Sequence, residues 1–175
     1  ELGLPAARVL VVAHLPLLAL LAQKLAQQVV PFSPGTLAEI EGANLVRWGL
    51  IPSWAKDPEI GSRMANARAD TAFEKPAFRN AMKSRRLLVP ADVFYEWQIV
   101  PGQSRKQPHA IRLVGGAPFA MGGLWEYWKA KDAGGDGADT GIVSGAILTT
   151  EANALMSRIH DRMPVIIAPE QYDAW

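Results

Sequence analysis

Three short segments of the chain carry polar and ionisable side chains at spacings that packing alone does not require. In the first, Asn66 and Arg68 are two residues apart, so in an extended backbone they project to the same side. An amide and a guanidinium presented together suit a phosphate or a sugar oxygen. The alternative is a turn or helix-capping Asn beside a solvated Arg, because Asn often serves those local roles. The pair is therefore a candidate ligand-binding site, with the local role left open.

The second segment is Phe94–Trp97, which places a carboxylate inside an aromatic, β-type run. Burial raises the pKa of a carboxyl group, which is what a general acid or base working near neutrality needs. Alternation puts Glu96 on the face of Phe94, whereas Tyr95 and Trp97 share the other face. The pattern does not decide which face is buried, so Glu96 could equally lie on the wet side of an edge strand.

The third segment runs from Ser157 to Pro164 and contains His160 where a helix is expected to end. A histidine at such a junction can be held by local backbone and still reach a pocket. A lone histidine is more often structural or exposed, and that reading stays open. Taken together, the three segments predict a Glu96–His160 pair with Asn66 nearby, but they do not assemble it in space.

The middle of the chain adds a possible nucleic-acid signal. Residues 47–112 carry 12 Lys and Arg against 6 Asp and Glu, a net of +6, whereas residues 1–46 and 113–175 are net −1 and −4. Trp48 and Trp54 bracket a Pro-containing loop in this basic third, and aromatics beside cations can stack unpaired bases. The alternatives are tryptophan as core filler and charges scattered over solvated faces.

The elements that must position these residues are short strands with few helices. Strands are predicted at Leu45–Leu50, Leu87–Val89, Phe94–Gln98, His109–Leu113, Phe119–Leu124, Ile142–Thr149 and Val165–Ile167. Helices are predicted over Thr71–Ser84, over Glu151–Ile159 and from Pro169 onwards, with irregular loops at Ser53–Arg63 and Lys131–Asp139. Without a repeated βαβ period, this order predicts an α+β fold. It consists of one domain over residues 1–175, with a curved, mostly antiparallel, barrel-like sheet flanked by a few helices.

Composition narrows the class of protein. The apolar run Val9–Ala22 is shorter than the roughly 18–20 residues of a membrane span and holds Pro16, so we expect a buried helix continuing to Gln28 and no membrane association. The chain has no cysteine and three histidines, so we expect neither a metal site nor a cofactor, and a cytoplasmic monomer. Because residue 1 is Glu and the last helix stops at Trp175, we also expect a truncated chain.

Four stretches in register resemble the SRAP (SOS-response-associated peptidase) family. They are RWGLIPSWAKDP (47–58), NARADT (66–71), RLLVPADVFYEW (86–97) and TTEANALMSRIHDRMP (149–164). The resemblance implies a single domain with a cleft for single-stranded DNA and a function in the SOS response to DNA damage. In that family an N-terminal cysteine, exposed by autopeptidase (hydrolase, protease) activity, crosslinks covalently to the ring-opened aldehyde of an abasic site. A lyase activity accompanies this crosslinking.

Carried over by position, the resemblance gives each site residue a role. Asn66 matches the asparagine that hydrogen-bonds the abasic sugar or the N-terminal group. Glu96 matches the family's acidic residue, and His160 the histidine that assists proton transfer. The positions expected at the DNA are Arg68 and Arg162 for phosphates and Trp48 for disrupting base stacking beside the lesion. Residues 1–44 diverge from the family pattern. Because the chain contains no cysteine, it cannot close the thiazolidine ring that the family forms.

Two other functions fit the same residues. One is a single-stranded DNA-binding module that keeps the cleft without the nucleophile. The other is an unrelated small cytosolic hydrolase that uses Glu96 and His160 on a small molecule. A basic rim on the cavity favours DNA, whereas a deep apolar pocket without such a rim favours the hydrolase.

Overall fold

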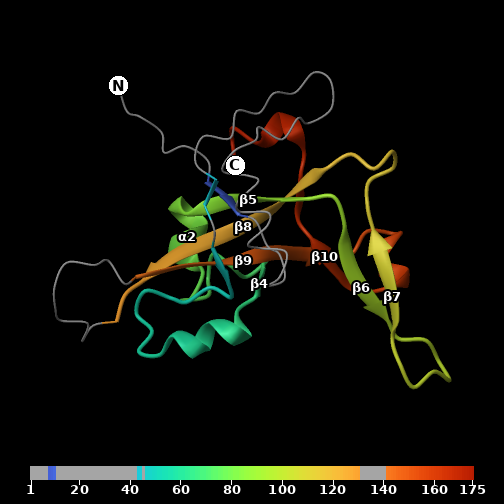
Figure 1. Cartoon of the computed structure of the whole chain (residues 1–175), viewed down its shortest axis with the longest axis horizontal. Coiled ribbons are helices and arrows are strands. Elements are labelled where there is room, and N and C mark those ends of the chain that lie inside the picture. Colours follow the sequence, from blue (N-terminus) through green and yellow to red (C-terminus); the bar gives the residue numbers. More distant parts are fainter. Residues whose placement is uncertain (1–7, 11–42, 45, 131–140) are drawn as a thin grey trace.

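The computed structural model describes residues 8–10, 43–44, 46–130 and 141–175, and short strands dominate it (Figure 1). The strands are β1 (Arg8–Leu10), β2 (Ala43–Asn44), β3 (Arg47–Trp48), β4 (Asn66–Arg68), β5 (Arg86–Ala91), β6 (Phe94–Gln98), β7 (Gln107–Ile111), β8 (Phe119–Trp128), β9 (Ile142–Glu151), β10 (Arg162–Pro164) and β11 (Ile166–Ile167). The helices are α2 (Arg79–Ser84) and the 3-10 helices η1 (Pro58–Arg63), η2 (Met156–Arg158) and η3 (Pro169–Gln171). The predicted α+β class with few helices is confirmed.

The main sheet is built around β5, β8 and β9, which pair antiparallel. Its order is β10-β9-β8-β5-β1-β2, and β3 and β4 join β9 by parallel pairing, as β1 joins both β2 and β5. The centre is therefore antiparallel as predicted, whereas the added strands make the sheet mixed. The sheet does not close, because β10 and β2 stand at opposite ends of its order. The hairpin β6–β7 forms a second, two-stranded sheet beside it (Figure 1).

Both faces of β8 are buried: one packs against α2, and the other faces the candidate site. Leu124 belongs to the cluster that includes Met82 of α2, so this helix covers one face of the sheet. Phe119 and Met121 belong to the opposite cluster, since strand side chains alternate between faces. Ile147 of β9 lies in this second cluster as well, and this is the face on which the candidate site opens.

The strands β8 and β9 splay apart at one end, and the chain from Arg162 to Ile167 fills the gap. Beyond their shared ladder, β9 pairs with β10 and the start of β8 pairs with β11. Val165 bridges the two strands: its N–H donates to Leu148 O (2.9 Å), and its carbonyl accepts from Gly122 N (2.8 Å). This insertion brings the segment that contains His160 beside the end of β9.

The helix predicted over Thr71–Ser84 is wrong in its first half. Residues 71–78 form hydrogen-bonded turns, and α2 begins only at Arg79. Pro76 explains the difference, because proline has no N–H to continue a helix and its ring clashes with the carbonyl four residues earlier. It also disfavours helical backbone at Lys75.

The helix predicted over Glu151–Ile159 is also wrong. Glu151 pairs with Arg162 in the β9–β10 ladder, so the intervening residues form a connection between two paired strands. Within it only η2 is helical, after a turn in which the Asn153 side chain accepts from the N–H groups of Leu155 and Met156 (3.1 and 2.9 Å). Strand pairing thus overrides the local helical pattern. The helix expected from Pro169 is present as the 3-10 helix η3.

The strand expected over Leu45–Leu50 is shorter than predicted, because Gly49 leaves extended geometry. Its φ of +108° is a conformation that residues with a Cβ rarely adopt. A Cβ on Gly49 would overlap the carbonyl oxygen of Gly61, where the loop and η1 approach backbone to backbone. The loop expected at Ser53–Arg63 therefore ends in η1, whose first turn is capped by Asp57 through Glu59 N (2.9 Å).

Two further sequence predictions concern the N-terminal stretch from Val9 to Gln28 and the loop at Lys131–Asp139. Val9 and Leu10 lie in β1, so the helix expected from Val9 to Gln28 does not begin where predicted. The remainder of that stretch and the Lys131–Asp139 loop lie outside the described residues. No described helix has the length and apolar character needed to cross a bilayer.

Candidate functional site

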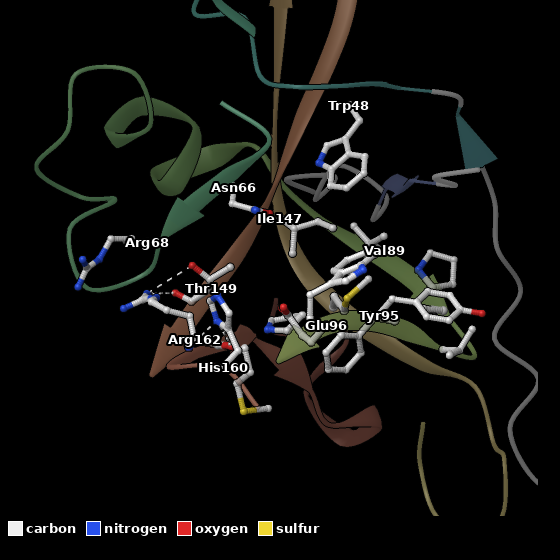
Figure 2. A pocket seen from close by; sticks show the side chains of 18 residues that line it. Trp48, Asn66, Arg68, Val89, Tyr95, Glu96, Ile147, Thr149, His160 and Arg162 are labelled. Carbon is white, nitrogen blue, oxygen red and sulfur yellow. Dashed lines mark hydrogen bonds between the residues drawn. The ribbon is translucent and has the colours of Figure 1, made fainter. Parts of the chain in front are cut away.

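A cavity of about 660 Å³ opens on the sheet face opposite α2, between the main sheet and the β6–β7 hairpin (Figure 2). Six residues to which the family resemblance gives a role come from four separate segments, and each of them lines it: Trp48, Asn66, Arg68, Glu96, His160 and Arg162. Its floor is apolar, with Val89, Met121 and Ile147 from the sheet. The cavity thus combines an apolar floor with a wall of polar and cationic side chains.

Asn66 and Arg68 lie on β4, where the strand pairs in parallel with β9. Ala67 between them is buried in the cluster that α2 covers, so its two neighbours face the other way, into the cavity. The alternation expected from the sequence therefore places the amide and the guanidinium on one wall (Figure 2).

Arg68 is engaged by a neighbouring carboxylate. Its Nε and Nη2 donate to the two oxygens of Asp70 at 3.3 and 2.9 Å, and both residues are exposed to solvent. This hydrogen bond raises the pKa of Arg68 and lowers the pKa of Asp70. The guanidinium keeps its other donors for a ligand, but Asp70 offsets part of its charge.

Arg162 lies deeper, with its side chain 16% exposed. Its Nη2 donates to the Thr149 carbonyl oxygen (2.6 Å) and to the Thr149 hydroxyl (3.4 Å), and lies 3.7 Å from Asp70 Oδ1. Its Nε is buried and has no hydrogen-bond partner among the described residues. Because Arg162 lines the cavity, the remaining donors of its guanidinium are suited to hold an anion that enters there.

His160 is held through one ring nitrogen. Its Nδ1 lies 3.1 Å from the backbone N of Arg162, 3.2 Å from the Arg162 carbonyl oxygen and 3.1 Å from Asp161 Oδ1. Asp161 is 87% exposed, so the backbone provides the firmer part of this support. Because Nδ1 is taken by these groups, Nε2 is the nitrogen left for proton transfer.

Glu96 reaches the cavity from β6, and Figure 2 shows its carboxylate pointing towards the wall that carries His160 and Arg162. No hydrogen bond joins the carboxylate directly to His160, although the two residues line the same cavity. Its register partner on β7 is His109. Glu96 is thus free to take a proton from a ligand or from a water molecule between it and His160.

Trp48 stands at the edge of the cavity, 48% exposed, with its indole N–H donating to Ala65 O (2.8 Å). This hydrogen bond fixes the ring plane while leaving a face accessible. Trp54, the other tryptophan that the sequence grouped with it, is 53% exposed but does not line the cavity. Tyr95 and Trp97 do line it, so aromatic side chains stand on both of its sides.

Sequence reasoning missed Asp70 and Thr149, which engage the two arginines. The spacing of Arg68 and Asp70 was a readable signal, because residues two apart share a side of an extended chain. The contact of Thr149 with Arg162 could not be predicted from the sequence, since only the pairing of β9 with β4 and β10 brings Thr149 to the arginines. Across the described ranges, no three His, Asp or Glu side chains cluster closely enough to hold a metal ion.

The family model described as "SOS response associated peptidase (SRAP)" matches residues 5–175. The chain belongs to the SRAP family. The resemblance carried by the four sequence stretches is thereby confirmed.

Named SRAP relatives agree in their description. The chain is 46% identical over 130 residues to "Abasic site processing protein YoaM" of Bacillus subtilis (strain 168), covering 74% of this chain and 54% of the relative. It is 33% identical over 150 residues to "Abasic site processing protein HMCES" of Pongo abelii, covering 72% and 42%. The chain therefore spans about half the length of these curated relatives.

Solved structures share the SRAP fold described here. A protein from Bacteroides thetaiotaomicron superposes with a TM-score of 0.65 at 35% identity, covering 73% of this chain and 55% of the other. A protein from Bordetella bronchiseptica gives a TM-score of 0.63 at 29% identity, covering 74% and 64%.

Proposed function

We propose that this SRAP-family chain is a DNA-damage-response protein that recognises abasic sites in single-stranded DNA. The observation that carries the proposal is the placement of six residues from four distant segments around one cavity. Its two arginines suit phosphates, and its aromatic rim suits unpaired bases. The relatives' names, abasic site processing proteins, point to the same substrate.

An abasic nucleotide fits this cavity better than an intact one. The sugar of an abasic site carries only a hydroxyl where the base was, so it is small enough to enter the cavity, where Asn66 can bond its oxygens. Arg68 and Arg162 then bind flanking phosphates, and Trp48 stacks on a neighbouring base. Duplex DNA cannot reach these groups without unstacking, which costs a few kcal/mol.

The chemistry proposed for the cavity is opening of the sugar ring. The closed deoxyribose is a hemiacetal: as the C1–ring oxygen bond breaks, the C1 hydroxyl loses a proton and the ring oxygen gains one, which leaves an aldehyde and a free hydroxyl. We assign these two proton transfers to Glu96 and His160, because both line the cavity and the His160 ring is held through Nδ1, not through Nε2.

The covalent step of the family needs a nucleophile beyond the groups described here. An amine adds to the aldehyde and releases water to form a Schiff base, and a thiol then closes a thiazolidine. No cysteine occurs among the 175 residues of this chain, so its own activity stops short of the thiazolidine. Autopeptidase (hydrolase) and lyase activity are assigned at the level of the family.

A second candidate is a single-stranded DNA-binding module without covalent chemistry, which needs the cavity but no cysteine among these 175 residues. The two candidates share the cavity and the DNA but differ in whether Glu96 and His160 act. The small-molecule hydrolase is disfavoured, because Arg68 and Arg162 line the cavity. We also propose a monomer in the cytoplasm, where a chain free of cysteine has no disulfide to form.

Titration of labelled oligonucleotides, intact or with one abasic site, tests the proposal at several salt concentrations. We expect micromolar or weaker, salt-sensitive binding to single strands, with tighter binding to the abasic strand. Affinity should fall as salt rises, with a slope of about −0.7 per phosphate contacted, and Arg68→Ala should flatten that slope. Binding that does not depend on salt, or that is tighter to duplex than to single strands, contradicts the proposed recognition of single-stranded DNA. Equal affinity for the two strands removes abasic recognition.

A further inference from the structure

The position of Glu96 in the cavity depends on how the β6–β7 hairpin is held. This hairpin forms its own two-stranded sheet and shares no ladder with the main sheet. Glu96 comes from this hairpin, whereas His160 follows η2 at the end of the main sheet. The spacing between the two side chains is therefore set by whatever fixes the hairpin against η2.

Two contacts hold β6 in place, one on each side of Glu96. At the base of the hairpin, Phe94 packs edge-on against Phe119 of β8, with ring centroids 6.2 Å apart. At the other end, Gln98 Nε2 donates to the carbonyl oxygen of Arg158 at 2.6 Å. Phe94, Glu96 and Gln98 share one face of the strand, so the carboxylate lies midway between the two contacts.

The acceptor of the Gln98 hydrogen bond belongs to the turn that carries His160. Arg158 is the last residue of η2, and the turn is closed by bonds from Ile159 N and His160 N to Met156 O (2.8 and 2.9 Å). Gln98 thus ties the strand of Glu96 directly to the turn of His160.

The Arg158 carbonyl fixes the orientation of the Gln98 amide, and that orientation sets which His109 ring nitrogen donates to it. A carbonyl oxygen only accepts, so the amide nitrogen must face Arg158, and Oε1 then faces His109 Nε2 at 3.0 Å. The His109 Nε2 is therefore the protonated nitrogen that donates. His109 lies directly opposite Glu96 in the β6–β7 register, so these bonds join residues that neighbour Glu96 on both strands of the hairpin.

We propose that Gln98, held in place by His109, is a positioning residue that sets Glu96 against His160 for recognition of the abasic sugar. This inference rests on the proposed function. Gln98 does not line the cavity and touches no substrate, so it acts only through Glu96. This positioning role requires a hydrogen-bond donor to the Arg158 carbonyl oxygen, and a side chain other than an amide can supply that donor.

The experiment compares abasic and intact single strands across a small set of variants. Gln98→Met keeps the length and removes the donor, and should lower the abasic-to-intact affinity ratio by up to roughly tenfold, the upper scale of one neutral hydrogen bond. Gln98→Lys restores a donor and should recover most of the ratio. The control is Gln107→Met on the opposite strand: its exposed side chain bonds, among the described residues, its neighbour Pro108 O alone (3.2 Å), and the variant should leave the ratio unchanged.

A double-mutant cycle separates positioning from general destabilisation. Adding Gln98→Met to Glu96→Gln should cause no further loss, because Gln98 acts through a carboxylate that is already gone. An unchanged ratio in Gln98→Met overturns the inference while the proposed function stands, as does full additivity of the two substitutions. So does failure of Gln98→Lys to recover the ratio.

A readout without DNA keeps the two proposals distinguishable. In amide NMR spectra of the free chain, Gln98→Met should shift Ile159 and His160, and Gln98→Lys should return them towards wild type. If wild type shows no preference for abasic strands, the proposed function falls and the recognition role of Gln98 falls with it. Unmoved amides overturn the link between hairpin and turn whatever the DNA result.

Discussion

Arg68 at the cavity wall is paired with Asp70, and this ion pair bears on the proposed binding of a phosphate. Arg68 lowers the pKa of Asp70, so the native state binds this proton less tightly than the unfolded chain does. The pair therefore stabilises the fold above the ordinary Asp pKa of about 3.9, and this contribution is lost as the pH falls through the lowered value. Near neutrality Asp70 stays ionised, so a change of pH does not release Arg68 and only substitution does.

Asp70→Asn should tighten binding of intact single strands and steepen its salt dependence. The carboxylate occupies two Arg68 donors and lies 3.7 Å from Arg162 Nη2, so it competes with phosphate at both cations. One additional phosphate contact should add about −0.7 to the slope of log affinity against log salt. The matched control is Glu74→Gln, an exposed carboxylate that lies outside the cavity. If both variants change the slope equally, the effect is one of net charge and not of this ion pair.

Trp48→Ala should weaken binding without changing the salt slope. Stacking on a base contributes about 1–3 kcal/mol per base and releases no counterion. Trp54→Ala is the control, because Trp54 is as exposed as Trp48 but lies outside the cavity. Fluorescence-anisotropy titrations at several salt concentrations measure both quantities. An equal loss in the two variants would place the stacking surface elsewhere.

At the scale of elements, strands were more predictable than helices. The alternating run Phe94–Gln98 was predicted with its observed bounds, because hairpin pairing follows the local pattern. The helix expected over Glu151–Ile159 failed, since Glu151 pairs with Arg162 and no single stretch of sequence reveals that partner. The helix expected over Thr71–Ser84 includes Pro76, and helical backbone begins only three residues after that proline.

The contact between β3 and η1 gives a stability prediction. Gly49→Ala should lower the free energy of unfolding by at least about 2 kcal/mol, because it combines left-handed backbone strain with overlap against Gly61 O. Gly102→Ala is the control, since Gly102 has φ +81° but open space around it, and should cost about 1 kcal/mol. Urea denaturation measures both. Equal losses would mean that the close approach to Gly61 contributes nothing.

For the whole molecule, the site segments were predictable but their assembly was not. Asn66, Glu96 and His160 were each found from local residue types, whereas their convergence depends on β4 pairing with β9 and on the insertion of β10 and β11. Gln98 and His109 escaped notice for the same reason, because their roles come from the β6–β7 register and a bond to a turn 60 residues away.

The location of bound DNA distinguishes a built site from general electrostatic attraction. The basic third, residues 47–112, includes Arg79 and Lys83 on α2. This helix covers the sheet face opposite the cavity. Simple attraction to positive charge predicts DNA on both faces, whereas the cavity predicts it on one. Hydrogen exchange with and without an abasic single strand should therefore show slower exchange in β4, β6 and the residues around His160. Exchange in α2 should be unchanged, because bound phosphates and bases protect only the amides they cover. Protection that includes α2 would mean that charge, and not the cavity, holds the strand.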